Sequence, residues 1–476
     1  MSGIAAELQK TIDLLKGGAA QNINALLPDV VKAWNLASGL QMYNLDPVAK
    51  ELYPVLSPIR NITPRLGGKG KQAEYKAITA VNTAALKGWA AEGAAGQQIT
   101  NATSDIISVY RTMALGDGVT FEQQWAGQGF IDSKSLAVAT LLRAMMIAEE
   151  NAILFGQNTL AATNQQAPGA IGTTATPTVA GSGTGGSIAT GTYYVVTVAN
   201  TGMGPAIKSA EVSSGALTGP NASITVTPVR TAGQPILGFD IYVGAASGGP
   251  YYKAIAGTHF AKQSDAYATN GAAVTLTSVP TSGATAPIAD ASADATAFNG
   301  LLAQIAGGSG ATITNVDAAL TDATPLDNHL KAMWDNGRAD PDLAMLNSTE
   351  SIKLTNITIG ASGTPYFVMV DQQNGATANY RVARFTNKVT GTEVQVRVHP
   401  TLAQGNILTL STKLPGWYVP TDIPAVWALD LVQDYIEIDY PPTRTDPQYN
   451  VEVRLFGTLK LYIPVLTGML RGIKSA

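Results

Sequence analysis

The sequence contains no cysteine, and only 13% of its 476 residues are charged. The missing thiols exclude disulfide bonds, thiolate catalysis and cysteine-ligated zinc. Lysine and arginine together number 30 against 34 acidic residues, so the chain lacks the positive excess of a sequence-specific nucleic-acid reader. Such sparse charge suits a protein that covers much of its surface with copies of itself.

Long apolar runs and targeting signals are missing as well. No stretch of about 18 apolar residues occurs, so we expect no membrane span. The N-terminal segment MSGIAAELQKTIDLLKGG is amphipathic and lacks the basic region and apolar core of a signal peptide. We therefore expect a chain that is not exported and that is compatible with a reducing cytoplasm.

Histidine is scarce, and the three that occur do not form a ligand pattern. His259, His329 and His399 lie in unrelated segments, without a second ligand three or four residues away. Metal-binding and catalytic histidines on helices usually show that spacing. We interpret these three as ordinary packed or surface residues.

Two further patterns resemble sites of chemistry. The acidic run from Asp430 to Asp439 suits a metal or an acid–base pair, but Glu437 and Asp439 alternate with isoleucines, which favours a solvated strand face. The G-x-G-x-x-G match at 181–186 is followed by a strand pattern where dinucleotide binding requires a helix, so we interpret it as a linker. We expect no catalytic residues, no metal and no cofactor.

One long helical pattern stands out in the chain. It runs from Asp132 to Gly156, with Asp132 or Ser133 as the N-cap and Gly156 closing the helix in a left-handed conformation. At 1.5 Å per residue the helix is a rod of roughly 30 Å, and we expect it to act as a spine for packed sheets. Apolar residues at helical spacing form its predicted core face: Val138, Leu141, Leu142 and Met145.

Residues 61–115 have the pattern of a long hairpin, with strands over 72–81 and 104–115 and a wide tip. A lone two-stranded hairpin is marginally stable in water, so we expect this one to rest on a neighbouring subunit. For its lysines, solubilising charge is an equal alternative. The candidate contact residues are Lys69, Lys71, Lys76, Lys87 and Trp89.

After Gly156 the composition changes to threonine, alanine, glycine and serine with short β-rich runs, which predicts a β-sandwich inserted in a loop of its host. Helices and strands resume near Asp290. The expected organisation is an arm at 1–60, the hairpin at 61–115, a domain at 116–164 with its helix at 132–155, the insertion at 165–289, a second host domain at 290–434 and return strands at 435–476.

This order of elements resembles the major capsid proteins of tailed bacteriophages with the Hong Kong 97 fold. The matching stretches are the hairpin, the helix at 132–155, residues 327–354 and residues 452–473. The resemblance implies an α+β fold with an N-arm, an E-loop, a peripheral domain with a spine helix, and an axial domain. Residues 187–280 resemble an immunoglobulin-like or fibronectin type III module, through TYYVVTVANTGMGPA and GFDIYVGAASGGPYY.

The resemblance implies a structural protein, not an enzyme, that assembles with itself as pentamers and hexamers into an icosahedral shell around double-stranded DNA. Implied partners are a portal, scaffolding or decoration proteins, and the packaged DNA through non-specific contacts, without a membrane. The chain would reside in the virion after assembly in the host bacterial cytoplasm. The short N-terminal segment implies a separate scaffold or none.

Three alternatives remain open. An encapsulin-like bacterial compartment shares the fold but packages enzymes. A carbohydrate-active enzyme with a fibronectin-like module would need a carboxylate pair in a cleft. A cell-surface adhesin is disfavoured by the missing export signal.

Overall fold

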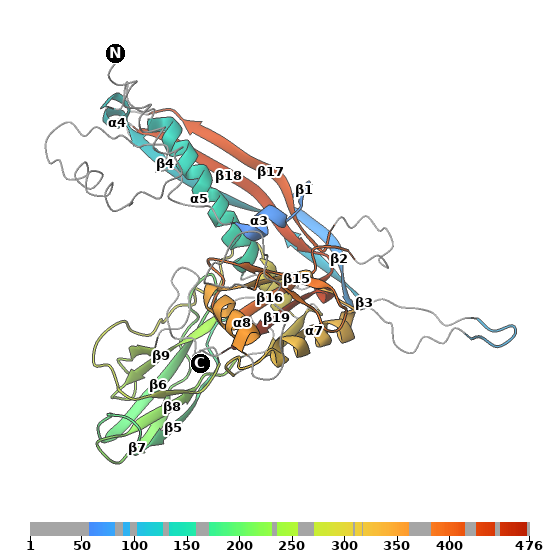
Figure 1. Cartoon of the computed structure of the whole chain (residues 1–476). Helices are drawn as coiled ribbons and strands as arrows, with labels where there is room; N and C mark the ends of the chain where they lie inside the picture. The colour runs from blue at the N-terminus through green and yellow to red at the C-terminus, as the bar shows by residue number, and fades with distance from the viewer. Residues whose placement is uncertain are drawn as a thin grey trace, which may run out of the picture. The chain divides into compact units, whose positions relative to one another are not determined.

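The computed structural model describes residues 57–80, 89–95, 102–126, 133–158, 171–230, 236–255, 271–307, 310–316, 318–360, 382–414, 425–442 and 448–473. The chain forms two compact units. The smaller contains Asp117–Thr140 and Tyr440–Asn450, and the larger contains Val55–Gly116, Leu141–Asp439 and Val451–Ala476. The mixed α+β class predicted from the sequence is confirmed, with several sheets and few helices among the described residues (Figure 1).

The longest described helix is α5, Ser133–Phe155, which we call the spine helix. In the larger unit it lies alongside strand β17, which belongs to a four-stranded sheet (Figure 1). The order of that sheet is β1 (Arg65–Gly67), β17 (Trp427–Tyr440), β18 (Gln448–Leu461) and β4 (Arg111–Thr120). The short helix α3, Pro58–Ile62, precedes β1, and α4, Phe121–Ala126, follows β4.

A two-stranded hairpin, β2 (Gln72–Ala80) with β3 (Ala102–Val109), leaves the body of the larger unit. Its buried side chains face one way and include Ala73, Ala77 and Ile106. The polar residues between them face solvent, as the two-residue period of a strand dictates.

A six-stranded mixed sheet forms the α/β part of the larger unit. It has a buried core of aliphatic residues, with helices α6 (Leu301–Ala306), α7 (Thr324–Gly337) and α8 (Ser348–Gly360) in the same region. The strand order is β12 (Thr312–Asn315), β19 (Thr467–Arg471), β16 (Asn406–Leu410), β13 (Leu343–Leu346), β15 (Glu393–Val398) and β14 (Arg384–Thr386). The C-terminal strand β19 thus lies one strand in from the edge, between β12 and β16.

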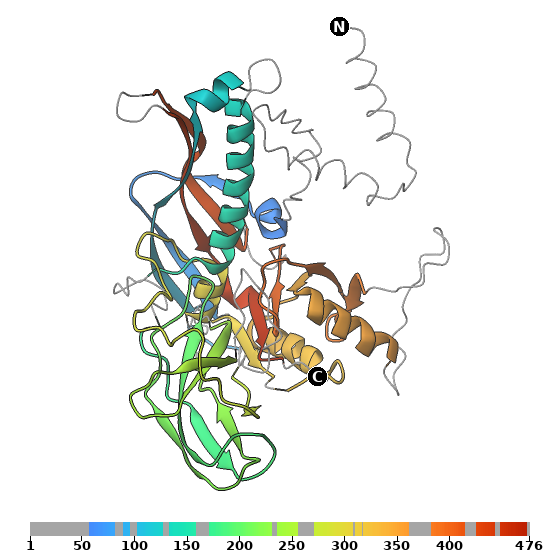
Figure 2. The same ribbon diagram turned by 90° about the vertical axis from the view of Figure 1, so that its left-hand side faces the viewer.

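Two further sheets share one apolar core between Thr178 and Leu276, drawn in green in Figure 2. One sheet has the order β10 (Tyr252–Ile255), β9 (Gly238–Gly244), β6 (Gly191–Asn200) and β7 (Val212–Leu217). The other has the order β11 (Val274–Leu276), β8 (Ser223–Thr227) and β5 (Thr178–Ser182).

Several sequence predictions were wrong in detail. The single strand predicted over 104–115 is two strands, because the chain leaves the hairpin at Tyr110 and enters the four-stranded sheet as β4. Strand β4 continues past Gly116, and helix α4 follows it. Strand β5 ends inside the glycine-rich motif at 181–186, which was interpreted as a linker, and strand β6 follows the motif. Strand β18 is continuous through Gly457.

Gly156 does not close the spine helix in a left-handed conformation. Its backbone N–H continues the helix by donating to Ala152, 3.0 Å away. A Cβ atom at this position would lie 2.4 Å from the carbonyl oxygen of Phe298. Glycine is therefore required by close backbone packing rather than by its φ angle.

Some predictions concern residues outside the described ranges: most of the arm, Lys87, Asp132, His259 and the strand expected at 365–371. No helix among the described residues is long and apolar enough to cross a membrane.

Candidate functional site

The spine helix carries a charged group in the interior of the larger unit: the side chain of Glu149 is completely buried. Its carboxylate accepts hydrogen bonds from Arg60 Nε at 2.7 Å and Arg65 Nη2 at 2.5 Å, and from the Tyr435 hydroxyl. Arg65 also reaches Asp434 Oδ1 at 2.5 Å. Burial, together with the hydrogen bond to Glu149, raises the pKa of Tyr435 to about 12, so its hydroxyl remains a donor. Two arginines thus compensate the charge of a carboxylate in the interior, and one phenol donates a further hydrogen bond to it.

The adjacent Glu150 is also buried and acts as the cap of another helix. The N-cap residue of α3, Ser57, makes no side-chain cap. Instead, the backbone N–H of Ile59 donates to Glu150 Oε1 at 3.0 Å and that of Arg60 donates to Oε2 at 2.6 Å. These are free donors of the first helical turn, where the helix dipole favours an anion. Glu150 therefore fixes where the chain segment before β1 meets the spine helix.

His399 contacts the other side of Glu150, with its Nε2 2.7 Å from Oε1. Its Nδ1 faces the backbone N–H groups of Thr401 and Leu402, each at 3.2 Å. Backbone N–H groups only donate, so Nδ1 accepts and the proton of the neutral ring lies on Nε2, where it donates to Glu150. The histidine links the spine helix to the loop between β15 and β16.

We call these residues the glutamate clamp: Glu149, Glu150, Arg60, Arg65, His399 and Tyr435. The clamp joins chain segments as much as 375 residues apart. All its side chains are engaged with one another, so the arrangement holds segments together and leaves no free nucleophile or base.

A second polar cluster holds the base of the hairpin. The hydroxyl of Tyr110 donates to Asp430 Oδ2 at 2.6 Å, and the same carboxylate oxygen forms an ion pair with Lys460. On the other strand, the hydroxyl of Tyr75 accepts from the backbone N–H of Leu461 at 3.3 Å. Burial raises the pKa of both tyrosines, so neither ionises near neutral pH. The predicted solvated strand face is confirmed at Glu437 and Asp439, which are exposed, but not at Asp430, which is buried.

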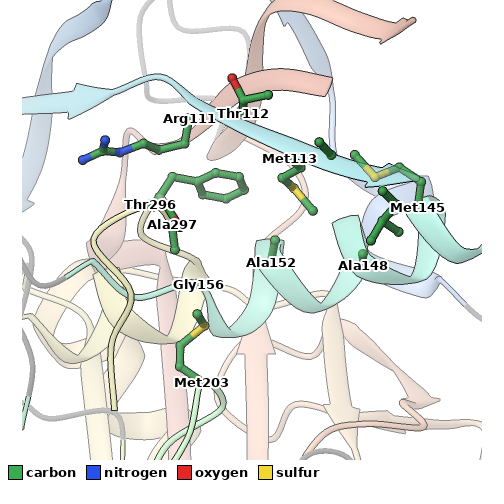
Figure 3. A pocket seen from close by; sticks show the side chains of 13 residues that line it. Arg111, Thr112, Met113, Met145, Ala148, Ala152, Gly156, Met203, Thr296 and Ala297 are labelled. Carbon is green, nitrogen blue, oxygen red and sulfur yellow. The ribbon is translucent and has the colours of Figure 1, made fainter. Parts of the chain in front are cut away.

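One pocket of about 300 Å³ lies in the larger unit, between strand β4 and the spine helix. Its lining is mainly apolar, and Figure 3 shows Arg111 at one end with its guanidinium directed away from the helix. It brings together no titratable groups that resemble a catalytic centre, and no group of three metal-binding side chains exists among the residues that the structure describes. The principal lining residues are Arg111, Met113, Met145, Ala148, Ala152, Met203 and Phe298.

The predicted contact residues of the hairpin are exposed wherever the structure describes them. Lys69, Lys71 and Lys76 are exposed, and the Lys76 ammonium lies 3.8 Å from Asp105 across the hairpin. Trp89 has 96% of its surface exposed, which is exceptional for an indole. The structure therefore leaves these groups available to a neighbour without showing one.

On the spine helix, Leu141 and Met145 are buried and Val138 is half-buried. Leu142 is not a core residue, because 38% of its surface is exposed. The buried stripe instead passes through Glu149 and Glu150, which the helical pattern had placed mostly off the core face. Two adjacent acids that follow an apolar run on the helix were the one sequence signal that could have located the clamp.

No protein-family model matches the chain, and no curated protein matches it. The solved structures similar to it include phage and GTA capsids. The capsid of the native GTA particle is 10% identical over 89% of this chain and 92% of that chain, with a TM-score of 0.40. The structure of Microbacterium phage Oxtober96 is 8% identical over 87% and 90%, with a TM-score of 0.39. The holo-SrpI encapsulin complex from Synechococcus elongatus PCC 7942 is 8% identical over 90% and 95%, also with a TM-score of 0.39.

Proposed function

We propose that this chain is a capsid shell protein that assembles with copies of itself, with the Hong Kong 97-like fold that its order of elements resembles. The observation that carries this proposal is the hairpin β2–β3. It forms a sheet of two strands only, yet it carries a tryptophan with 96% of its surface exposed. Two strands are too few for independent stability, and tryptophan is highly buried on average in folded proteins.

The base of the hairpin is built to hold it in one direction. Tyr75 and Tyr110 fasten its two strands to β18 and β17 through hydrogen bonds to Leu461 and Asp430. A hairpin that is fixed at its base and carries an exposed tryptophan farther out is suited to contact a neighbouring subunit. Repetition of such a head-to-tail contact closes into rings when the rotation allows it, which is the geometry of pentamers and hexamers.

The finer proposal is the major capsid protein of a tailed bacteriophage, located in the virion, assembled in the bacterial cytoplasm and enclosing double-stranded DNA. Portal, scaffolding or decoration proteins are its further partners, and it catalyses no reaction. The two-sheet sandwich between Thr178 and Leu276 is proposed to be an immunoglobulin-like module that projects outward. Net charge of −4 favours few, sequence-independent contacts with DNA phosphates.

The test is negative-stain electron microscopy and light scattering of the purified full chain, alone and with the scaffolding protein of its own genome. We expect closed shells of uniform size, or rings of five and six that convert into shells. A chain that stays monomeric in every condition contradicts the proposal. Nucleic acid rather than packaged enzyme in particles from the native source separates the phage capsid from the encapsulin-like alternative.

Trp89→Ala tests the role of the hairpin. We expect it to abolish or strongly reduce shell formation and to leave the unfolding of the monomer unchanged, because the indole makes almost no contact within its own chain. Ile288→Ala is the matched control, since it removes another largely exposed apolar side chain outside the hairpin. Equal assembly by the two variants would show that the hairpin does not make the contact.

A further inference from the structure

A second buried glutamate, Glu350, lies in the first turn of α8 and belongs to neither polar cluster described above. The helix is capped by Asn347, whose Oδ1 accepts from the backbone N–H of Thr349 at 2.9 Å. The side chain of Glu350 is 0% exposed, and neither of its carboxylate oxygens has a hydrogen-bond partner among the described residues. The nearest cation is the ammonium of Lys353, 3.9 Å away. An ionised carboxylate in this position costs considerable free energy.

The loop that Glu350 contacts is the one that carries His399. This loop, residues 399–405, joins β15 to β16. Asn347 donates from Nδ2 to the carbonyl oxygen of Leu402 at 2.8 Å, and the backbone N–H of His399 donates to Leu346 at 2.8 Å. The backbone of Gly405 lies close enough to Glu350 to favour its anion, although the contact falls short of hydrogen-bond geometry.

The same loop contacts the spine helix on its other side, through His399 and Glu150 at 2.7 Å. The loop is thus held between two buried glutamates, one on α5 and one on α8. Only Glu150 has donors that satisfy its charge, from the backbone of α3. The contact with α8 is therefore the one that a change of protonation would weaken.

The charges around the loop come from every element packed on it. On α5, Glu149 pairs with Arg60 and Arg65, and Glu150 contacts His399, while Lys353 on α8 faces Glu350. On β19, Arg471 is buried and its Nε donates to Asn315 at 2.6 Å. Burial is the largest influence on Glu350 and raises its pKa to about 7, against the smaller opposing effects of Gly405 and Lys353.

We propose that Glu350 is a proton-operated latch: protonated, it lets α8 close on the loop 399–405, and ionised, it opens that contact and loosens His399 from the spine helix. The neutral acid fits a buried site in which no described group hydrogen-bonds to the carboxylate and the nearest described cation is 3.9 Å away. The anion is better solvated when the loop moves away and water enters. The latch couples the α/β part of the larger unit to the spine helix, and it acts irrespective of whether the chain forms shells.

The size of the effect follows from linkage. In the open state the pKa of the Glu350 carboxyl takes its ordinary value of 4.5, and in the closed state this pKa is about 7. Between pH 6 and pH 8 the opening equilibrium should then increase about tenfold. Because the pKa of Glu350 is raised in the closed state, the closed loop is favoured at low pH and loses stability as the pH rises through about 7.

The test is hydrogen exchange with mass spectrometry on the full chain at pH 6 and pH 8, corrected for the intrinsic pH dependence of exchange. Peptides covering the loop and the first turn of α8 should show about tenfold more opening at pH 8. Glu350→Gln, which stays neutral, should abolish this difference. Glu393→Gln is the control, because that carboxylate forms an exposed ion pair with Arg384 and should leave the difference intact.

Two results would overturn the latch. One is a loop in the unmodified chain whose corrected exchange is equal at both pH values. The other is a Glu350→Gln variant that keeps the difference. If the amide of that variant prevents folding, Glu350→Met, which is apolar and of similar length, takes its place with the same expectation.

Discussion

The glutamate clamp predicts that Glu149→Gln destabilises the folded chain. This change keeps the shape of the side chain and removes its charge, so Arg60 and Arg65 lose their shared anion in a mostly buried site. The amide also turns a nitrogen donor toward groups that themselves donate, including the hydroxyl of Tyr435. Both effects act on the folded state, because the arginines are fully hydrated in the unfolded chain.

The expected loss is about 3 kcal/mol of stability in the larger unit. Removing one partner of a buried ion pair typically costs about 3–5 kcal/mol, because the remaining charge is left without compensation. Here the lower end applies, since the two arginine side chains are 16% and 27% exposed and Arg65 keeps Asp434. Water can reach both guanidinium groups in part.

Urea unfolding followed by circular dichroism measures this loss, and hydrogen exchange of the peptide that contains α3 locates it. Glu393→Gln is again the matched control, because its exposed ion pair should contribute no more than about 0.5 kcal/mol. A double-mutant cycle with Arg60→Ala should give a coupling energy above about 1 kcal/mol. Equal urea midpoints for the two glutamine variants would refute the clamp as a stabilising element.

Three further predictions follow from buried positions. Burial lowers the pKa of His329 from 6.5 to about 4. The folded state therefore loses stability as the pH falls below 6.5, and the loss should reach about 2.5 kcal/mol at pH 4.5. His329→Gln should flatten this pH dependence in urea titrations. Gly156→Ala should destabilise by at least about 2 kcal/mol in the same assay, because its Cβ would meet the Phe298 carbonyl oxygen at 2.4 Å; an unchanged urea midpoint would contradict the packing. Phe239→Ala, in a small buried cluster at the start of strand β9, should cost about 3–5 kcal/mol and lower only the sandwich transition in calorimetry. A shift of all transitions together would show that the sandwich does not unfold separately.

Local pattern was sufficient for much of the fold. The start at Thr324 and Pro325 and the end at Asn336 and Gly337 predicted α7, and a β-rich run over 191–200 predicted strand β6 with its observed limits. These elements carry local signals, because proline is favoured at the first helical position and β-branched and aromatic residues are favoured in strands. Short strands such as β5 and β12 were missed, since three to five residues rich in threonine and glycine show no period.

The chain sequence by itself determined the class of the protein: no thiol chemistry, few charges, one long helix, a two-stranded hairpin and a segment rich in short strands. Only the tertiary structure decided what the polar residues do. Glu149 and Glu150 looked like solvated positions of an amphipathic helix, but Arg60 and His399, 89 and 249 residues away along the chain, bury and satisfy them. Periodicity describes neighbours on one element, whereas the partner of a buried charge is chosen by the packing of elements distant in sequence.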